Sequence, residues 1–198
     1  MTYADWAEVL ARNLLAGSLP RRWAHSQGVA ATARTLVPLL RDAEDLMTAA
    51  AWLHDIGYAP GLHATGFHPL DGARYLRDIH HAGPMLCRLV AHHSCAINEA
   101  AERGLAADLA REFKPAPRDL ADALIYCDMV TGPDGHCMTV ERRLNEIRAR
   151  YGPGSVVTRA LARSGPELTA AVSRVTCKLA RTAPSAGPDG LAMALAAN

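Results

Sequence analysis

The chain has 198 residues, of which 49% are hydrophobic and 21% are charged, and its formal net charge is +1. This length and balance favour one globular domain with a substantial core. A net charge so close to zero gives no basic excess and argues against nucleic acid as the main partner, although most of the basic residues are arginines, which could still form a local cluster.

Two further features concern where the protein works. No apolar stretch reaches the ~18 charge-free residues that a membrane span requires. The five cysteines show no CxxC spacing, and residues 1–6 do not begin a basic segment followed by an apolar one, as a secretory leader does. We therefore expect a cytoplasmic protein with reduced thiols.

Apolar residues that recur with a period close to 3.6 predict a series of helices along the chain. The expected ranges are 3–15, about 20–40, 42–57, about 68–76, about 86–93, 119–130, about 139–151 and 155–182. Pro20 is expected in the opening turn of the second helix, and Asp42 is expected to cap the third. Residues 94–116 look irregular with short helical pieces, and residues 131–135 predict a turn.

Strand-like alternation of apolar and polar residues never extends beyond a few positions. The predicted fold class is therefore all-α, a compact helical domain over residues 1–182. The remaining residues, 183–198, are rich in Ala, Pro, Gly and Ser, which predicts a poorly ordered tail.

The most informative pair is His54-Asp55, which follows the apolar run 49–53 at the end of the third predicted helix. A carboxylate buried there loses its hydration unless a positive charge compensates it, and a metal ion commonly does so. Consecutive helical side chains point roughly 100° apart, so both can reach one ion only near a helix end, or Asp55 can bridge two ions. An isolated doublet is better interpreted as a helix-end hydrogen bond, but the neighbouring residues favour a metal site.

Further imidazole and carboxylate groups fall on the neighbouring predicted helices. His25 lies one helix before the doublet, and Asp128 lies in an apolar setting where an unpaired carboxylate would be costly. A salt bridge to an arginine is the alternative for Asp128. His68, at a constrained position before a proline, and His92 are candidates for a second metal position that includes Asp55.

The predicted metal ligands therefore come from successive helices, and they are His25, His54, Asp55, His68, His92 and Asp128. A set of imidazoles and carboxylates without a thiolate suits one or two divalent ions of Mn, Fe, Co, Ni or Zn. His93, directly after His92, is an alternative donor that we interpret as a substrate contact.

The order of these residues resembles the H…HD…D signature of the HD-domain superfamily of metal-dependent phosphohydrolases. The intervening histidines match the extended pattern H…HD…H…H…D of its dinuclear members. The resemblance spans roughly residues 20–130 and includes RWAHS at 22–26, WLHDIG at 52–57 and LVAHHS at 89–94. It implies a helical fold and a dinuclear metal site.

One departure from the family pattern narrows the function. Cyclic-dinucleotide phosphodiesterases of this superfamily have Lys after the His-Asp-x-Gly unit, where this chain has Tyr58, and their Gly-Tyr-Pro signature is absent. Cyclic-dinucleotide cleavage is therefore not predicted. Tyr58 either donates to a phosphate oxygen or packs beside the pocket. Arg22, near a helix start, is favoured over Arg21 as an outward-facing anion contact, with a merely exposed arginine as the alternative.

The resemblance implies hydrolysis of a phosphoester or phosphoanhydride in a nucleotide or another small phosphorylated molecule. A metal pair bridged by Asp55 would lower the pKa of a bound water and neutralise phosphoryl oxygens. His54, Asp55 and His93 are the predicted catalytic residues, and Arg22, Tyr58 and His93 the predicted substrate contacts. Two alternatives stay open, namely an HD-type di-iron oxygenase acting on a small organic or phosphonate substrate, and a nucleotide-binding protein without turnover. An oligomer is compatible with the sequence.

Overall fold

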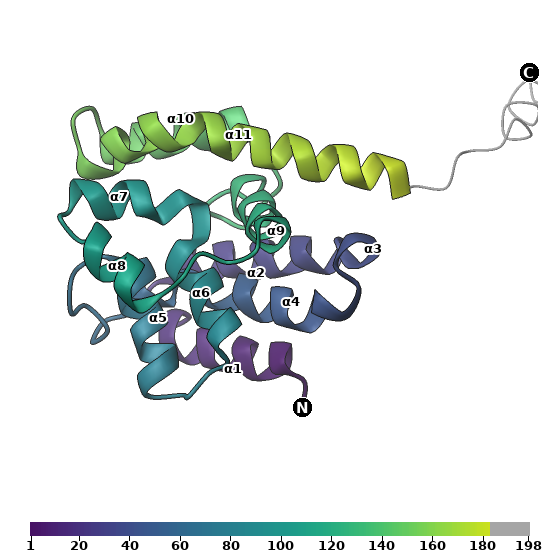
Figure 1. Ribbon diagram of the computed structural model, residues 1–198, viewed down its shortest axis with the longest axis horizontal. Helices are drawn as coiled ribbons and strands as arrows, with labels where there is room; N and C mark the ends of the chain where they lie inside the picture. Colours follow the sequence, from purple (N-terminus) through teal and green to yellow (C-terminus); the bar gives the residue numbers. More distant parts are fainter. Residues whose placement is uncertain (183–198) are drawn as a thin grey trace, which may run out of the picture.

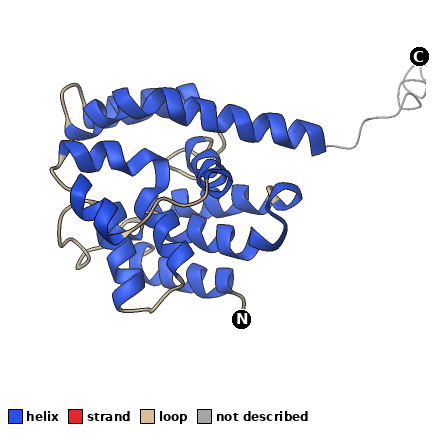
Figure 2. Ribbon diagram, in the orientation of Figure 1, coloured by secondary structure: helices blue, strands red, loops and turns tan. Residues whose placement is uncertain are grey.

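A computed structural model describes residues 1–182, and its regular structure over that range is helical (Figure 1; Figure 2). Among these residues, an isolated bridge between Thr131 and Cys137 is the only strand-like pairing. The all-α prediction is therefore confirmed. The predicted tail, 183–198, lies outside the described residues.

The helices follow one another through short connections. The N-terminal ones are α1 (Tyr3–Leu15), α2 (Pro20–Arg34), α3 (Val37–Leu40), α4 (Glu44–Leu53), α5 (His68–Asp78) and α6 (Pro84–His92). They are followed by α7 (Ala96–Glu102), α8 (Ala106–Glu112), α9 (Arg118–Met129), α10 (Val140–Tyr151) and α11 (Val156–Thr182). Short 3₁₀ turns are η1 (Arg41–Ala43), η2 (Ile56–Tyr58) and η3 (His93–Cys95).

Local sequence explains where several helices begin. Thr2 and Asp5 form a capping box at the start of α1, in which each side chain accepts from the other's backbone N–H. Proline occupies the first turn of α2, α5 and α6, where its missing N–H costs no helical hydrogen bond. His68, which begins α5, is therefore placed at a well-defined helix start.

Helix α4 forms the centre of the molecule. Every residue from Met47 to Leu53 is buried, and α1, α2, α6 and α9 all pack against this helix. A helix that is apolar around its whole circumference belongs in a core. The run of three alanines at 49–51 has small side chains that let the neighbouring helices approach closely. The chain leaves α4 at His54, so the doublet lies deep inside the protein.

Helices α10 and α11 form a second layer over the bundle made by α1–α9, and the far end of α11 extends beyond it (Figure 1). They pack on each other, and α11 also packs on α7 and α9. Their apolar residues meet the end of α9 in a separate small core of Ile125, Met129, Val140, Leu144, Leu161, Leu168, Ala171 and Val172. Residues 1–182 thus form two apolar clusters, one in the bundle and one beneath this layer.

The structure corrects three predicted helix boundaries. Helix α4 ends at Leu53 rather than at Gly57. Helix α2 ends at Arg34 rather than near residue 40, because in a continuous helix the ring of Pro38 would clash with the carbonyl of Arg34. Asp42 lies in η1 and does not cap α4, which begins at Glu44 after Ala43. The short helices α7 and α8 confirm the interpretation of residues 94–116. Within residues 1–182, none of the helices has both the length and the apolarity to cross a membrane.

Candidate metal centre

Three predicted ligands from distant parts of the chain meet in one group, here called group 1: His25 of α2, His54 at the end of α4 and Asp128 of α9. Their ligand atoms lie within 4.8 Å of one another, and all three residues are buried. His25 Nε2 lies 3.0 Å from Asp128 Oδ1. The packing of α2 and α9 against α4 produces this convergence.

Backbone carbonyls fix the orientation of both imidazoles in group 1. His25 Nδ1 lies 2.9 Å from the carbonyl oxygen of Gly132, and His54 Nδ1 lies 2.8 Å from that of Ala51. Because a carbonyl oxygen only accepts, each Nδ1 carries the hydrogen, and Nε2 of the neutral ring keeps a lone pair. Hydrogen bonds of this kind orient the histidines of many metal sites.

The Nε2 atom of His54 is buried and has no hydrogen-bond partner among the described residues. Leaving a buried polar atom unsatisfied costs free energy, and such atoms are rare in folded proteins. The lone pair of this atom faces the ligand atoms of His25 and Asp128. A divalent ion would satisfy all three at once, so the residues present fit a metal ion.

A second group, here called group 2, lies beside the first and contains Asp55, His68 and His93. Asp55 Oδ1 lies 3.3 Å from His68 Nε2 and 3.8 Å from His93 Nε2. The two histidine Nε2 atoms are 3.2 Å apart. His93 Nδ1 donates to the carbonyl of Val90 at 2.7 Å, which directs its Nε2 lone pair into the group. Group 2 therefore has the same donor chemistry as group 1.

Asp55 lies between the two groups. Its Oδ2 atom is 3.6 Å from His54 Nε2, while its Oδ1 atom faces group 2. The backbone of Asp55 is no longer helical, with φ −101° and ψ 5°, so consecutive side chains are freed from the angle that a helix imposes. Asp55 occupies the position that a bridging ligand needs, and its bridging role stays a prediction.

Glycines allow the close backbone contacts that shape both groups. A Cβ added to Gly57 would lie only 2.0 Å from the carbonyl oxygen of His68, so η2 can touch the start of α5 only with glycine at this position. A Cβ added to Gly28 would lie 2.4 Å from the carbonyl oxygen of Gly135. The absence of a side chain at Gly28 therefore lets the turn 131–135 pack against α2. That turn supplies the carbonyl that orients His25.

The structure does not place His92 in either group, which corrects its expected position; His93 lies with Asp55 and His68 instead. His92 Nε2 donates to the carbonyl of Phe113 at 2.7 Å, away from both groups. His93 is only 6% exposed. The apolar positions 86, 89 and 90 are buried, and position 93 continues their spacing of i, i+3, i+4 and i+7. That spacing was visible in the sequence and would have favoured His93.

Charge and burial set the protonation states that metal binding needs. Burial raises the pKa of the Asp55 carboxyl, but the nearby Arg22 guanidinium and His54 outweigh it and hold the pKa well below its usual range. For Asp128, burial is likewise outweighed by His25 and by Arg143. Burial lowers the pKa of His68 to about 3. The carboxylates are therefore ionised and His68 is neutral near pH 7, as ligands must be.

A family model for the HD domain matches residues 22–129, slightly more than half of the chain. The chain belongs to the HD-domain family. Searches among curated proteins and among solved structures gave no match. HD domains are in general metal-dependent hydrolases that bind divalent ions, and the matched range contains every residue of groups 1 and 2. Helices α10 and α11 follow the matched range.

In this HD-domain protein, Arg22 faces inward, which corrects the expectation of an outward-facing anion contact. Its Nη1 atom donates to Asp55 Oδ2 at 2.7 Å. Its guanidinium lies 3.9 Å from the centre of the Tyr58 ring, and that ring stacks on His68 with centroids 3.9 Å apart. Arg21 is the exposed arginine and pairs with Asp134. Arg22 therefore neutralises Asp55 and, with Tyr58, holds His68 in position.

Two residues near the metal groups were not predicted from the sequence. Arg143 of α10 is 3% exposed, and its Nη2 atom lies 3.4 Å from both Asp128 Oδ1 and His25 Nε2. Its spacing relative to the apolar positions 140, 144 and 147 would have placed it on the inward face of α10. Ser94 donates its hydroxyl hydrogen to Asp128 Oδ2. Its backbone is left-handed, with φ 49°, and no pattern in the sequence indicated this.

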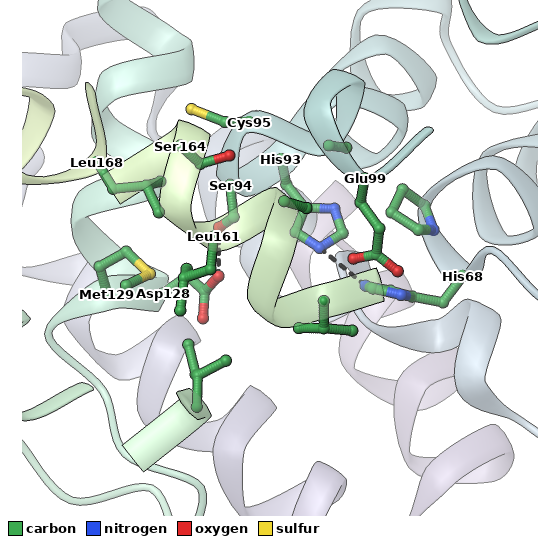
Figure 3. Close-up of a pocket in the computed structure, with 15 residues that line it drawn as sticks. His68, His93, Ser94, Cys95, Glu99, Asp128, Met129, Leu161, Ser164 and Leu168 are labelled. Atoms are coloured by element: carbon green, nitrogen blue, oxygen red, sulfur yellow. Dashed lines mark hydrogen bonds between the residues drawn. The ribbon is translucent and has the colours of Figure 1, made fainter. Parts of the chain in front are cut away.

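The two HD-domain ligand groups open onto a cavity of about 100 Å³ that continues under α11. Figure 3 shows His68 and His93 together on one side of it, with Met129 and Leu168 across from them. The apolar side chains come from the small core beneath the α10–α11 layer. The donors of the metal groups thus face a space with one polar and one apolar wall, which is typical of a small-molecule site.

Proposed function

We propose that this HD-domain protein is a metal-dependent phosphohydrolase that cleaves a phosphoester or phosphoanhydride bond in a nucleotide or another small phosphorylated molecule. The observation that carries the proposal is the pair of adjacent buried donor groups with Asp55 between them. Divalent ions bound by these donors would activate a water molecule and neutralise charge on the phosphoryl oxygens, the two services that such hydrolysis needs.

The protein's own residues prepare the site before any ion binds. The Nδ1–H bonds of His25, His54 and His93 fix three Nε2 lone pairs toward the interior. Asp55 is only 3% exposed, and the Arg22 guanidinium, 2.7 Å away, offsets its charge and keeps the carboxylate ionised. Donors held in this way need little rearrangement on binding, which favours both affinity and geometry.

Surrounding residues restrict what reaches the donors. Asp55, His68 and His93 line a cavity of about 90 Å³ whose other walls include Tyr58 and Tyr151. These side chains displace part of the water beside the reacting group, which strengthens electrostatic interactions there. A substrate would enter with its phosphoryl group toward the donors and its leaving group toward the apolar wall under α11.

The proposal is tested by metal analysis followed by a substrate panel. The purified protein is stripped with a chelator, reloaded separately with Mn, Fe, Co, Ni or Zn, and assayed for phosphate release from nucleotides and small phosphate esters. We expect release with at least one metal and none with the stripped protein. Asp55→Asn should abolish release, whereas His92→Gln, whose ring contacts Phe113 instead, should retain it.

The same assay separates the proposal from its alternatives. Bound iron with substrate-dependent oxygen consumption and no phosphate release would replace hydrolysis by oxygenation, because four histidines and two aspartates also suit a di-iron site. A protein that binds nucleotides with unchanged affinity after Asp55→Asn and never forms product would instead be a binding protein. Either result contradicts the phosphohydrolase proposal.

A further inference from the structure

Helix α10 presents two arginines to the cavity that contains the candidate metal ligands. Arg143 and Arg150 both line it, together with Asp55 and Asp128. Both guanidinium groups pair with the same carboxylate oxygen, Glu146 Oε2, at 2.8 Å and 2.9 Å. Glu146 therefore holds the two guanidinium groups close together, but its single negative charge neutralises only one of them. The pair belongs to α10, beyond the range that matches the HD domain.

Arg143 has donors without adequate acceptors. Its side chain is 4% exposed, and its Nε atom has no hydrogen-bond partner among the described residues. Within residues 1–182, its Nη2 atom makes two long contacts of 3.4 Å, to His25 Nε2 and Asp128 Oδ1. A buried guanidinium is costly unless its N–H groups are satisfied. A cation held by His25 and Asp128 would compete for the same two atoms, so Arg143 would then need another acceptor.

The charges around the cavity favour an anion with more than one negative charge. Three guanidinium groups, those of Arg22, Arg143 and Arg150, line the cavity or reach into it. They are balanced by three carboxylates, those of Asp55, Asp128 and Glu146. These groups therefore sum to no net charge, and Glu99, which lines the adjoining cavity under α11, is paired with Arg103. Any bound divalent ion adds positive charge. A doubly charged phosphoryl group compensates that excess better than the single charge of a phosphodiester.

We propose that Arg143 and Arg150, held together by Glu146, form a phosphoryl-binding arm that selects substrates with a terminal, doubly charged phosphoryl group, such as phosphomonoesters. This inference rests on the proposed function, since it names the substrate class of the same site. Guanidinium groups bind phosphoryl oxygens through paired, charge-assisted hydrogen bonds. The partly exposed Arg150, with 28% of its side chain accessible, meets the phosphoryl group at the cavity edge, and the buried Arg143 holds it inside.

Binding of inorganic phosphate tests the arm without relying on turnover. Wild-type protein, Arg143→Gln, Arg150→Gln and the control Arg148→Gln are loaded with the same metal, and phosphate is titrated by calorimetry. Arg148 lies on the same helix but does not line the cavity, and its guanidinium contacts Asn145. We expect phosphate affinity to fall roughly 10-fold or more in the two arm variants and to stay unchanged in the control, with equal metal content in all four proteins.

Unchanged phosphate affinity in Arg150→Gln and in folded Arg143→Gln would overturn the proposal. If Arg143→Gln does not fold, as judged by circular dichroism, Arg150→Gln and Glu146→Gln decide it. A purely structural role for these residues would lower thermal stability without a selective loss of phosphate affinity, and that outcome also contradicts the arm.

Kinetics with phenyl phosphate and diphenyl phosphate separate this inference from the proposed function. The arm predicts that the wild type prefers the monoester and that Arg150→Gln raises KM for the monoester about 10-fold, with a smaller change for the diester. Hydrolysis with an unchanged KM and unchanged phosphate affinity would remove the arm and leave the phosphohydrolase proposal standing. If the variants lose phosphate affinity but the wild type hydrolyses no ester with any metal, the arm would stand as a phosphate-binding feature and the phosphohydrolase proposal would fall.

Discussion

The bundle of α1–α9 and the layer of α10 and α11 contribute to the site in different ways. The bundle supplies the histidine and aspartate side chains of the two groups. Backbone carbonyls of Gly132, Ala51 and Val90 hold three of the histidine rings in place. The layer contributes the longer side chains of Arg143 and Arg150 and an apolar wall. Metal ligation requires donors placed within tenths of an ångström, whereas recognition of a phosphoryl group tolerates longer side chains. Under the two proposals, the bundle would carry out the chemistry and the layer would select the substrate.

Removal of a ligand from the bundle should have the largest effect on activity. Asp55→Asn keeps the shape of the side chain but removes the charge that lies between the two ligand groups. We expect phosphate release to fall by roughly 10³-fold or more and bound metal to decrease with it. His54→Ala should behave in the same way. Full metal content with full activity in either variant would show that the doublet does not bind metal.

Replacement of each of the two adjacent histidines separates them within the bundle. His93→Gln should lose the metal held by group 2, because His93 Nε2 faces Asp55 and His68. His92→Gln should keep its metal content, because that ring contacts Phe113. Metal analysis of both variants after dialysis against a weak chelator measures the difference. The reverse pattern would restore His92 as the ligand.

A cavity in the layer should lower stability without removing metal. Leu168 of α11 is 1% exposed and belongs to the small core beneath the layer. Leu168→Ala should lower the free energy of unfolding by about 2–5 kcal/mol, because large buried side chains leave unfilled space when truncated. Urea unfolding measures the loss, and metal analysis should give the wild-type content. Lost metal in the folded variant would show that the layer and the bundle do not act separately.

Extra bulk at a close contact in the bundle should lower stability to a smaller extent. Gly57→Ala places a methyl group where its distance to the His68 carbonyl oxygen would be 2.0 Å, so the backbone must move. We expect a loss of about 1–3 kcal/mol in unfolding free energy and weaker metal binding in group 2. Gly17→Ala is the matched control, since a Cβ there would meet nothing within 4 Å. Equal stability of the two variants would show that the close contact at Gly57 does not restrict the side chain at this position.

The smallest effect concerns pH, which distinguishes the buried imidazoles of the bundle from the arginines of the layer. In the metal-free protein, burial lowers the pKa of His68 to about 3, whereas the unfolded chain binds this proton near pH 6.5. The unfolded state therefore binds more protons between these values, so stability falls as pH decreases through that window. Arginines do not titrate there.

His68→Gln should weaken this pH dependence without abolishing it, because burial also lowers the pKa of His93. Urea unfolding with a chelator at pH 7 and at pH 4.5 measures the difference between the two proteins. An identical pH dependence in wild type and variant would argue against a buried, neutral His68.

Most of the helices could be predicted from the sequence, because periodicity and capping are local properties. The predictions failed where a local signal was misread. Pro38 was included in a helix that ends at Arg34, and Asp42 was assigned a cap that it does not form. His93 directly follows α6 in register with its buried positions 86, 89 and 90, and Arg143 lies on the buried face of α10, so helical spacing carried a signal for both.

The all-helical architecture and the set of possible donors follow from the chain alone, since the His54-Asp55 doublet and the order of the other histidines and aspartates are local properties. Which donors meet depends on how the helices pack. His25 and Asp128 are 103 positions apart, and their contact depends on how α2 and α9 pack on α4. The inward direction of Arg22 and the participation of α10 have the same origin. Local spacing specifies the face of a helix, but only packing specifies what that face touches.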